Sequence, residues 1–139
     1  MKVIMLLGVS NIGKTTTINE VYNALAGKNG ENIICPKTGF TGSPKDFECV
    51  LKYKEKQIAL FSLGDLSREV TQAMCYYDNM KCDILVCACN INRLMPQRYL
   101  ARYPGSQIIQ KSIANQKAEE YKENKEDANK IISLIQKMI

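Results

Sequence analysis

The chain has 139 residues, of which 45% are hydrophobic and 24% charged, and it carries a formal net charge of +5. This length fits one domain of about 100–200 residues, so we expect a single domain over residues 1–139. The absence of histidine excludes histidine-based acid–base chemistry, and six cysteines without a C-x-x-C pair argue against a zinc site.

Neither a membrane nor a nucleic acid is indicated as a partner. No apolar run approaches the roughly 20 residues that cross a bilayer, and the opening "MKVIMLLGVS" is too short for a signal peptide. Lysines alternate with acidic residues along the chain instead of gathering in one basic segment. We therefore expect a cytoplasmic protein that does not bind membranes.

The chain opens with a predicted strand, a glycine-containing loop and a helix. The run Val3–Leu7 is continuously apolar, which is typical of a strand buried on both faces. From Lys14 onward, Ile18, Val21 and Leu25 fall at helical spacing. The sequence therefore predicts a helix that begins at Lys14.

A turn-rich segment, "GKNGEN", ends this helix and is followed by a brief apolar run at 33–35, a candidate short strand. Residues 36–46 are dense in Pro, Gly, Ser and Thr, which indicates an exposed loop. Alternation at 47–53, a polar "KEK" turn and an apolar run at 58–63 then predict an antiparallel hairpin. Its second arm is expected to enter the centre of the sheet.

The second half continues to alternate helices and strands. We predict a helix at 66–77, a buried strand at 82–90, a short helix at 95–105 and a last strand at 106–113. Cys87 and Cys89 lie on one face of the buried strand, where reduced core thiols are expected. From residue 115 the spacing predicts one long or broken amphipathic helix. The fold class expected is α/β, with three layers, a mainly parallel sheet and an antiparallel hairpin at its edge.

The loop between the first strand and the first helix matches the phosphate-binding pattern G-x-x-x-x-G-K-[ST] at Gly8, Gly13, Lys14 and Thr15. Glycines let the backbone approach a phosphate closely, and the helix N-terminus adds partial positive charge. Lys14 would reach the β- and γ-phosphates, and the Thr15 hydroxyl would coordinate Mg²⁺. An ordinary turn made by two glycines is the alternative. We call residues 8–15 the candidate phosphate loop.

With this motif the sequence resembles the P-loop NTPases. The resemblance implies a three-layer P-loop fold, Mg²⁺ and ATP as cofactors, and Lys14 as a catalytic residue. It also implies a nucleotide-binding set consisting of Gly8, Ser10, Asn11, Ile12, Gly13, Lys14, Thr15 and Thr16.

A second acid is expected at the end of a neighbouring strand, and Asp65 follows the apolar run at 58–63. We predict that Asp65 is catalytic and binds Mg²⁺ together with Thr15. Capping of the following helix is the alternative role, since aspartate is a common N-cap. Gly64 would let the backbone approach a γ-phosphate.

The guanine-specificity pattern N-K-x-D of GTPases is present at residues 124–127. It follows a charged helical segment instead of a buried strand, so we predict a solvated helix surface there. Guanine specificity is therefore unsupported, and we expect ATP to be bound at least as well as GTP.

Several further side chains are weaker candidates, for which surface roles are the alternative. Thr38 and Thr41 could close on Mg²⁺ as switch threonines. Arginines 93, 98 and 102 could form a lid, and Glu69 or Gln72 could position water.

The sequence thus predicts a Mg²⁺-dependent nucleoside-triphosphate-binding protein, an ATP-binding NTPase with a regulatory or assembly role. A GTPase-like switch with a protein partner and a small nucleotide or metabolite kinase remain as alternatives. A kinase would need room for an acceptor, and the chain leaves little sequence to build it.

Overall fold

The computed structural model describes all 139 residues and contains six strands and four α-helices. The strands are β1 (Lys2–Gly8), β2 (Ile33–Phe40), β3 (Ser43–Tyr53), β4 (Lys56–Phe61), β5 (Ile84–Asn90) and β6 (Gln107–Gln110). The helices are α1 (Lys14–Leu25), α2 (Ser67–Asn79), α3 (Leu94–Tyr99) and α4 (Glu120–Met138), with short 3-10 turns at Leu100–Arg102 and Lys117–Glu119. None of these helices has the length and apolarity to span a bilayer.

All six strands form one mixed sheet in the order β2-β3-β4-β5-β1-β6. β4, β5, β1 and β6 run parallel to one another, whereas β3 is antiparallel to both β2 and β4. The predicted hairpin at 47–63 is confirmed, and its second arm, β4, lies inside the sheet. The two residues of its turn, Lys54 and Glu55, both have positive φ, which is the conformation of the tight hairpin turns.

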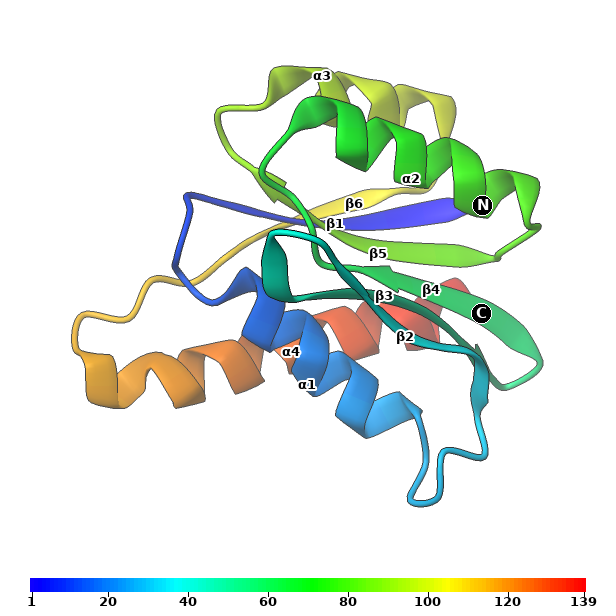
Figure 1. The fold of residues 1–139 in the computed structure, drawn as a ribbon, viewed down its shortest axis with the longest axis horizontal. Coiled ribbons are helices and arrows are strands. Elements are labelled where there is room, and N and C mark those ends of the chain that lie inside the picture. Colours follow the sequence, from blue (N-terminus) through cyan, green and yellow to red (C-terminus); the bar gives the residue numbers. More distant parts are fainter.

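Helices cover both faces of the sheet, with α1 and α4 on one face and α2 and α3 on the other (Figure 1). Two hydrophobic clusters of 17 and 16 buried residues occupy these faces. Successive residues of β1 alternate between them, since Ile4 and Leu6 join the first cluster while Val3 and Met5 join the second. This alternation is the two-residue period of a strand with both sides buried, as the continuous apolar run predicted.

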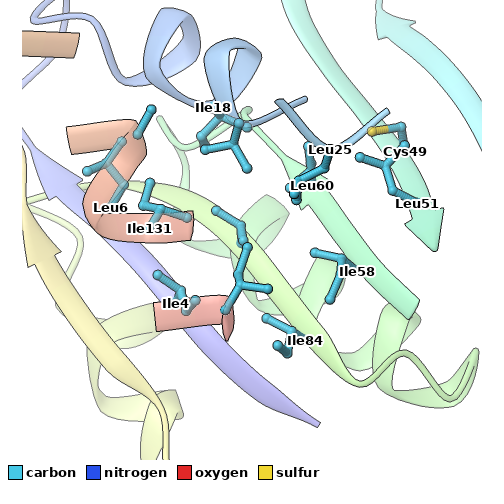
Figure 2. Packing of buried hydrophobic residues seen from close by; sticks show 14 of the residues in the cluster. Ile4, Leu6, Ile18, Leu25, Cys49, Leu51, Ile58, Leu60, Ile84 and Ile131 are labelled. Carbon is cyan, nitrogen blue, oxygen red and sulfur yellow. The ribbon is translucent and has the colours of Figure 1, made fainter. Parts of the chain in front are cut away.

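Figure 2 shows the cluster beneath α1 and α4, where Ile18 and Ile131 from the helices meet Ile4, Leu6 and Leu60 from the strands. All five side chains are fully buried. This packing fixes the N-terminus of α1 against the sheet at the end of β1.

The expected cysteine positions are confirmed. Cys87 and Cys89 are buried on the same face of β5, in the cluster beneath α2. All six cysteines are free thiols. Four of them, Cys49, Cys82, Cys87 and Cys89, are buried as small apolar core residues, whereas Cys35 is half-buried and Cys75 is exposed.

The loop predicted over 36–46 is wrong. Residues 33–40 form β2, and a turn at Thr41 and Gly42 leads directly into β3. β2 is an edge strand with interrupted register, where Pro36 is tolerated because an edge strand need not donate every ladder hydrogen bond. Gly42 supplies the positive φ of the turn.

The solvated surface predicted at 124–127 is also wrong in part. Lys125 and Glu126 are exposed, but Asn124 is only 7% exposed and Asp127 is completely buried. Both buried side chains lie on the face of α4 that packs against α1 and the end of β6. Their partners, described below, explain how a carboxylate can be buried there.

Candidate functional site

A cavity of about 530 Å³ lies at the end of the sheet where β1 and β4 terminate. Four segments line it: the candidate phosphate loop with the start of α1, the start of β3, the segment after β4, and the first turns of α4. The 15 lining residues include no hydrophobic side chain: Ser10, Asn11, Gly13, Lys14, Thr15, Thr16, Ser43, Pro44, Lys45, Asp46, Ser62, Gly64, Asp65, Glu120 and Asn124. Such a cavity suits a highly charged, hydrophilic ligand.

The structure brings together most of the predicted nucleotide-binding residues but not all of them. Ser10, Asn11, Gly13, Lys14, Thr15 and Thr16 line the cavity, whereas Gly8 and Ile12 do not. Ile12 instead folds back on Gly8, where an added Cβ would lie 2.6 Å from Ile12 Cδ1. Gly8 and Ile12 therefore pack against each other within the loop, and neither residue lines the cavity.

The N-terminus of α1 points its free backbone N–H groups at this cavity. Gly13 begins the helix with φ of +96°, and no side chain caps it. The first backbone hydrogen bond of the helix runs from the Thr17 N–H to Gly13 O, at 2.9 Å. The N–H groups of Lys14, Thr15 and Thr16 consequently have no acceptor within the helix, and an anion at the cavity would meet them.

Lys14 folds over the candidate phosphate loop and is 8% exposed. Its Nζ donates to Gly8 O at 3.0 Å and also to Val9 O. Burial lowers the pKa of Lys14, while the nearby carboxylates of Asp65 and Asp46 act in the opposite direction. The ammonium group is thus held at the loop by carbonyl oxygens, within a cavity that is also lined by the carboxylates of Asp46, Asp65 and Glu120.

Asp46 is the acid that contacts the threonine of the motif. Thr15 Oγ1 donates to Asp46 Oδ1 at 2.6 Å, and Ser62 Oγ donates to the same oxygen at 2.9 Å. Ser62 is itself fixed because its hydroxyl accepts the Phe47 N–H at 2.9 Å. A carboxylate and a hydroxyl this close supply the hard oxygen ligands that Mg²⁺ takes in proteins.

Asp65 lines the same cavity but makes no side-chain hydrogen bond to Thr15. The alternative role as an α2 cap is wrong, since Leu66 is the N-cap residue and no side chain caps the helix. Gly64 is required by close packing, because an added Cβ would lie 2.6 Å from the backbone of Ala88. Arg93 contacts this segment through Nε, which donates to Asp65 O at 2.7 Å.

A buried ion pair fastens α4 beside the candidate phosphate loop. Lys111 Nζ lies 2.8 Å from Asp127 Oδ2, and both side chains are 0% exposed. Ser112 adds two hydrogen bonds to the same carboxylate, from its N–H at 2.9 Å and its hydroxyl at 2.8 Å. Burial raises the pKa of Asp127, but the bonds from Lys111 and Ser112 outweigh burial and hold it below its ordinary value.

The remaining sequence candidates lie outside the cavity. Thr38 is on the exposed edge strand β2 and Thr41 is in the hairpin turn. Glu69 and Gln72 line a separate cavity between α2 and the strands. Arg98 and Arg102 are exposed around α3, where Arg102 donates to the Tyr99 hydroxyl. Only Arg93 of the three arginines contacts a segment that lines the site.

No group of three or more His, Cys, Asp or Glu side chains converges anywhere in the protein. The chain matches no protein-family model, no curated protein and no solved structure.

Seven lining residues are not predicted by the sequence: Ser43, Pro44, Lys45, Asp46, Ser62, Glu120 and Asn124. The sequence predicts an exposed loop around Asp46 and a solvated helix surface around Asn124, so neither pattern indicates a role in the site. A usable signal exists for Asp46, because it directly precedes the alternating run at 47–53 that forms the first arm of the predicted hairpin, and in the structure it belongs to the same strand, β3. For the two α4 residues, only the packing of α4 against α1 reveals the position.

Proposed function

We propose that this chain is a P-loop nucleotide-binding protein that takes ATP with Mg²⁺ at the candidate phosphate loop and hydrolyses it in a regulatory or assembly role. The observation that carries the proposal is the convergence of Lys14, Thr15 and the free N–H groups of α1 on one cavity without apolar side chains. Nucleoside triphosphates are commonly bound by this combination of groups: a lysine and backbone amides contact the phosphates, and a hydroxyl coordinates the Mg²⁺ ion.

The residues present fit a magnesium ion. Mg²⁺ is usually held by one or two carboxylates together with substrate phosphates and water, so a cluster of three acids is not required. Thr15 and Asp46 would hold the ion, and Asp65, on the same cavity, would reach it directly or through water. When bound, Mg²⁺ neutralises charge on the phosphate oxygens.

Lys14 would move from the carbonyls of Gly8 and Val9 to the β- and γ-phosphates. Its charge, together with the amides of α1, would stabilise the negative charge of the transferred phosphoryl group. Outside the loop, Lys45 lines the same cavity and is the cation best placed to add to this charge, whereas Arg93 contacts only the backbone of Asp65.

A regulatory role is favoured by the way β3 enters the site. Residues 43–46 line the cavity and directly follow the turn between β2 and β3. A ligand that contacts Asp46 would therefore also affect the position of the exposed β2–β3 hairpin. Asp127 does not read a guanine base in this arrangement, because Lys111 and Ser112 already occupy both of its carboxylate oxygens. ATP is therefore expected to bind at least as well as GTP.

Titration of the purified protein with ATP, GTP and their diphosphates, with Mg²⁺ and with EDTA, tests the proposal. Lys14→Ala should lose triphosphate affinity by about tenfold to a hundredfold, as expected for removal of a charged donor worth about 1.5–3 kcal/mol. Lys28→Ala, at an exposed lysine in the turn after α1, is the matched control and should bind as the parent does. Unchanged affinity in Lys14→Ala would refute the phosphate-binding role of the loop.

A further inference from the structure

Two residues of α4 line the same cavity as the candidate phosphate loop. Glu120 and Asn124 are separated by four positions, so they lie on one face of the helix, about 6 Å apart along its axis. Asn124 is the nearer to the loop, since its Oδ1 would lie 2.4 Å from a Cβ added to Gly13. Glu120 therefore faces a part of the cavity one helical turn further along.

The amide of Asn124 is buried on one side and open on the other. Thr17 Oγ1 lies 3.4 Å from its Oδ1, and the residue is 7% exposed. Its Nδ2 donates to no protein group, although no buried side-chain nitrogen or oxygen in the structure lacks a partner. Nδ2 must therefore face open space, and the cavity is the space that Asn124 lines.

This turn of α4 is held in place before any ligand arrives. Asp127, less than one turn beyond Asn124, is anchored by Lys111 and Ser112 in the buried network described above. Lys111 also packs against the loop, because its Cβ would lie 3.0 Å from a Cβ added to Gly8. The wall formed by α4 is thus preorganised relative to the candidate phosphate loop.

Glu120 is an exposed carboxylate without an ion pair or hydrogen bond in the protein. A carboxylate repels phosphate, so its favourable partner in a nucleotide is the uncharged sugar or base beyond the phosphates. A sugar hydroxyl can donate to Glu120 and accept from the Asn124 amide at the same time.

We propose that Glu120 and Asn124 form the sugar-binding wall of the nucleotide site, with Glu120 accepting hydrogen bonds from the ribose hydroxyls and Asn124 Nδ2 donating to them. This inference rests on the proposed nucleotide-binding function. It assigns to Glu120 and Asn124 the selectivity of the site for a ribonucleoside triphosphate over a bare triphosphate chain.

The test compares the dissociation constants of ATP, GTP, 2′-deoxy-ATP and inorganic tripolyphosphate, all with Mg²⁺. Glu120→Ala and Asn124→Ala should each weaken ATP and GTP about tenfold, the effect of one hydrogen bond that involves a charged or buried group. Tripolyphosphate affinity should stay within about twofold, and Glu120→Ala should reduce the preference for ATP over 2′-deoxy-ATP. Glu126→Ala, an exposed acid on the same helix outside the cavity, is the matched control.

Equal losses for ATP and tripolyphosphate would overturn the sugar assignment, because they would place these side chains at the phosphates. Tighter binding of every ligand by Glu120→Ala would also overturn the sugar assignment, since it would show that the Glu120 carboxylate only repels the phosphates. A loss confined to GTP would indicate contact with the base instead of the ribose. A parent protein that binds ATP no more tightly than tripolyphosphate would refute this inference alone, whereas a parent protein that binds neither ligand would refute the proposed function too.

Discussion

Asp127→Asn should cost the protein a large part of its free energy of unfolding. The substitution keeps the shape of the side chain but removes the charge that balances Lys111, and both groups are completely buried. Breaking a buried ion pair from one side typically costs about 3–5 kcal/mol, because the remaining charge is left without its partner. The total free energy of unfolding of a domain of this size is about 5–15 kcal/mol, so the variant should be strongly destabilised but still folded.

The lower end of that range, about 3 kcal/mol, applies here. The asparagine oxygen can still accept one of the two bonds from Ser112, so part of the network survives. Lys130 adds little to the balance, since its ammonium lies 3.6 Å from Asp127 and is 59% exposed. With an m-value of about 1–3 kcal/mol per molar urea, the unfolding midpoint should fall by about 1–3 M.

The assay is equilibrium urea unfolding at neutral pH, followed by circular dichroism, with Glu126→Gln as the control on the exposed face of the same helix. The pKa of Asp127 is held below its ordinary value, so its contribution is present above about pH 4 and is lost as the pH falls through the folded pKa. The parent should therefore lose stability in acid more steeply than Asp127→Asn. A loss below about 1 kcal/mol, similar to that of Glu126→Gln, would refute the buried pair as an anchor of α4.

Three further outcomes follow from the same contacts. Gly13→Ala should lower the free energy of unfolding by about 1–2 kcal/mol, since φ there is +96°; a neutral result in urea unfolding would contradict the left-handed geometry. Asp46→Asn should reduce the Mg²⁺-dependent part of ATP affinity about tenfold and more than Asp65→Asn does, because Asp46 contacts Thr15; the reverse order in titrations with Mg²⁺ and EDTA would return the metal role to Asp65. Exposed Cys75 should react first with a thiol reagent, whereas Cys89, whose pKa burial raises to about 11, should react only on unfolding; mass spectrometry of the labelled native protein checks this, and early labelling of Cys89 would contradict its burial.

The elements that the sequence predicts well are those whose apolar residues follow one clear pattern, either a continuous run or helical spacing. Val3–Leu7 and the helix from Lys14 have uninterrupted apolar patterns, because both faces of β1 and one face of α1 are buried. Only the first three residues of β2, the apolar run at 33–35, are predicted as a strand, and its continuation over 36–40 could not be predicted in the same way. An exposed edge strand with Pro36 and Gly39 has the composition of a loop, and only pairing with β3 distinguishes the two.

The candidate site follows a similar division. Lys14 and Thr15 are identified by spacing alone, since a local motif fixes their geometry. Asp127 looked solvated because its neighbours Lys125 and Glu126 are exposed, and its partner Lys111 lies 16 positions away. Burial of a charge depends on such distant partners, and no local pattern encodes them.

The most direct measurement of the central claim is a ¹H–¹⁵N NMR titration of the labelled protein with ATP and Mg²⁺. We expect the largest amide shifts at Gly13, Lys14 and Thr15, where the free N–H groups of α1 meet the phosphates. A second cavity of about 600 Å³, at the opposite end of the sheet, includes Lys2, Lys56 and Lys81 and serves as an internal control that should not shift. Shifts confined to that lysine-lined cavity, or none at residues 13–15 at saturating ATP, would contradict the proposed phosphate-binding function.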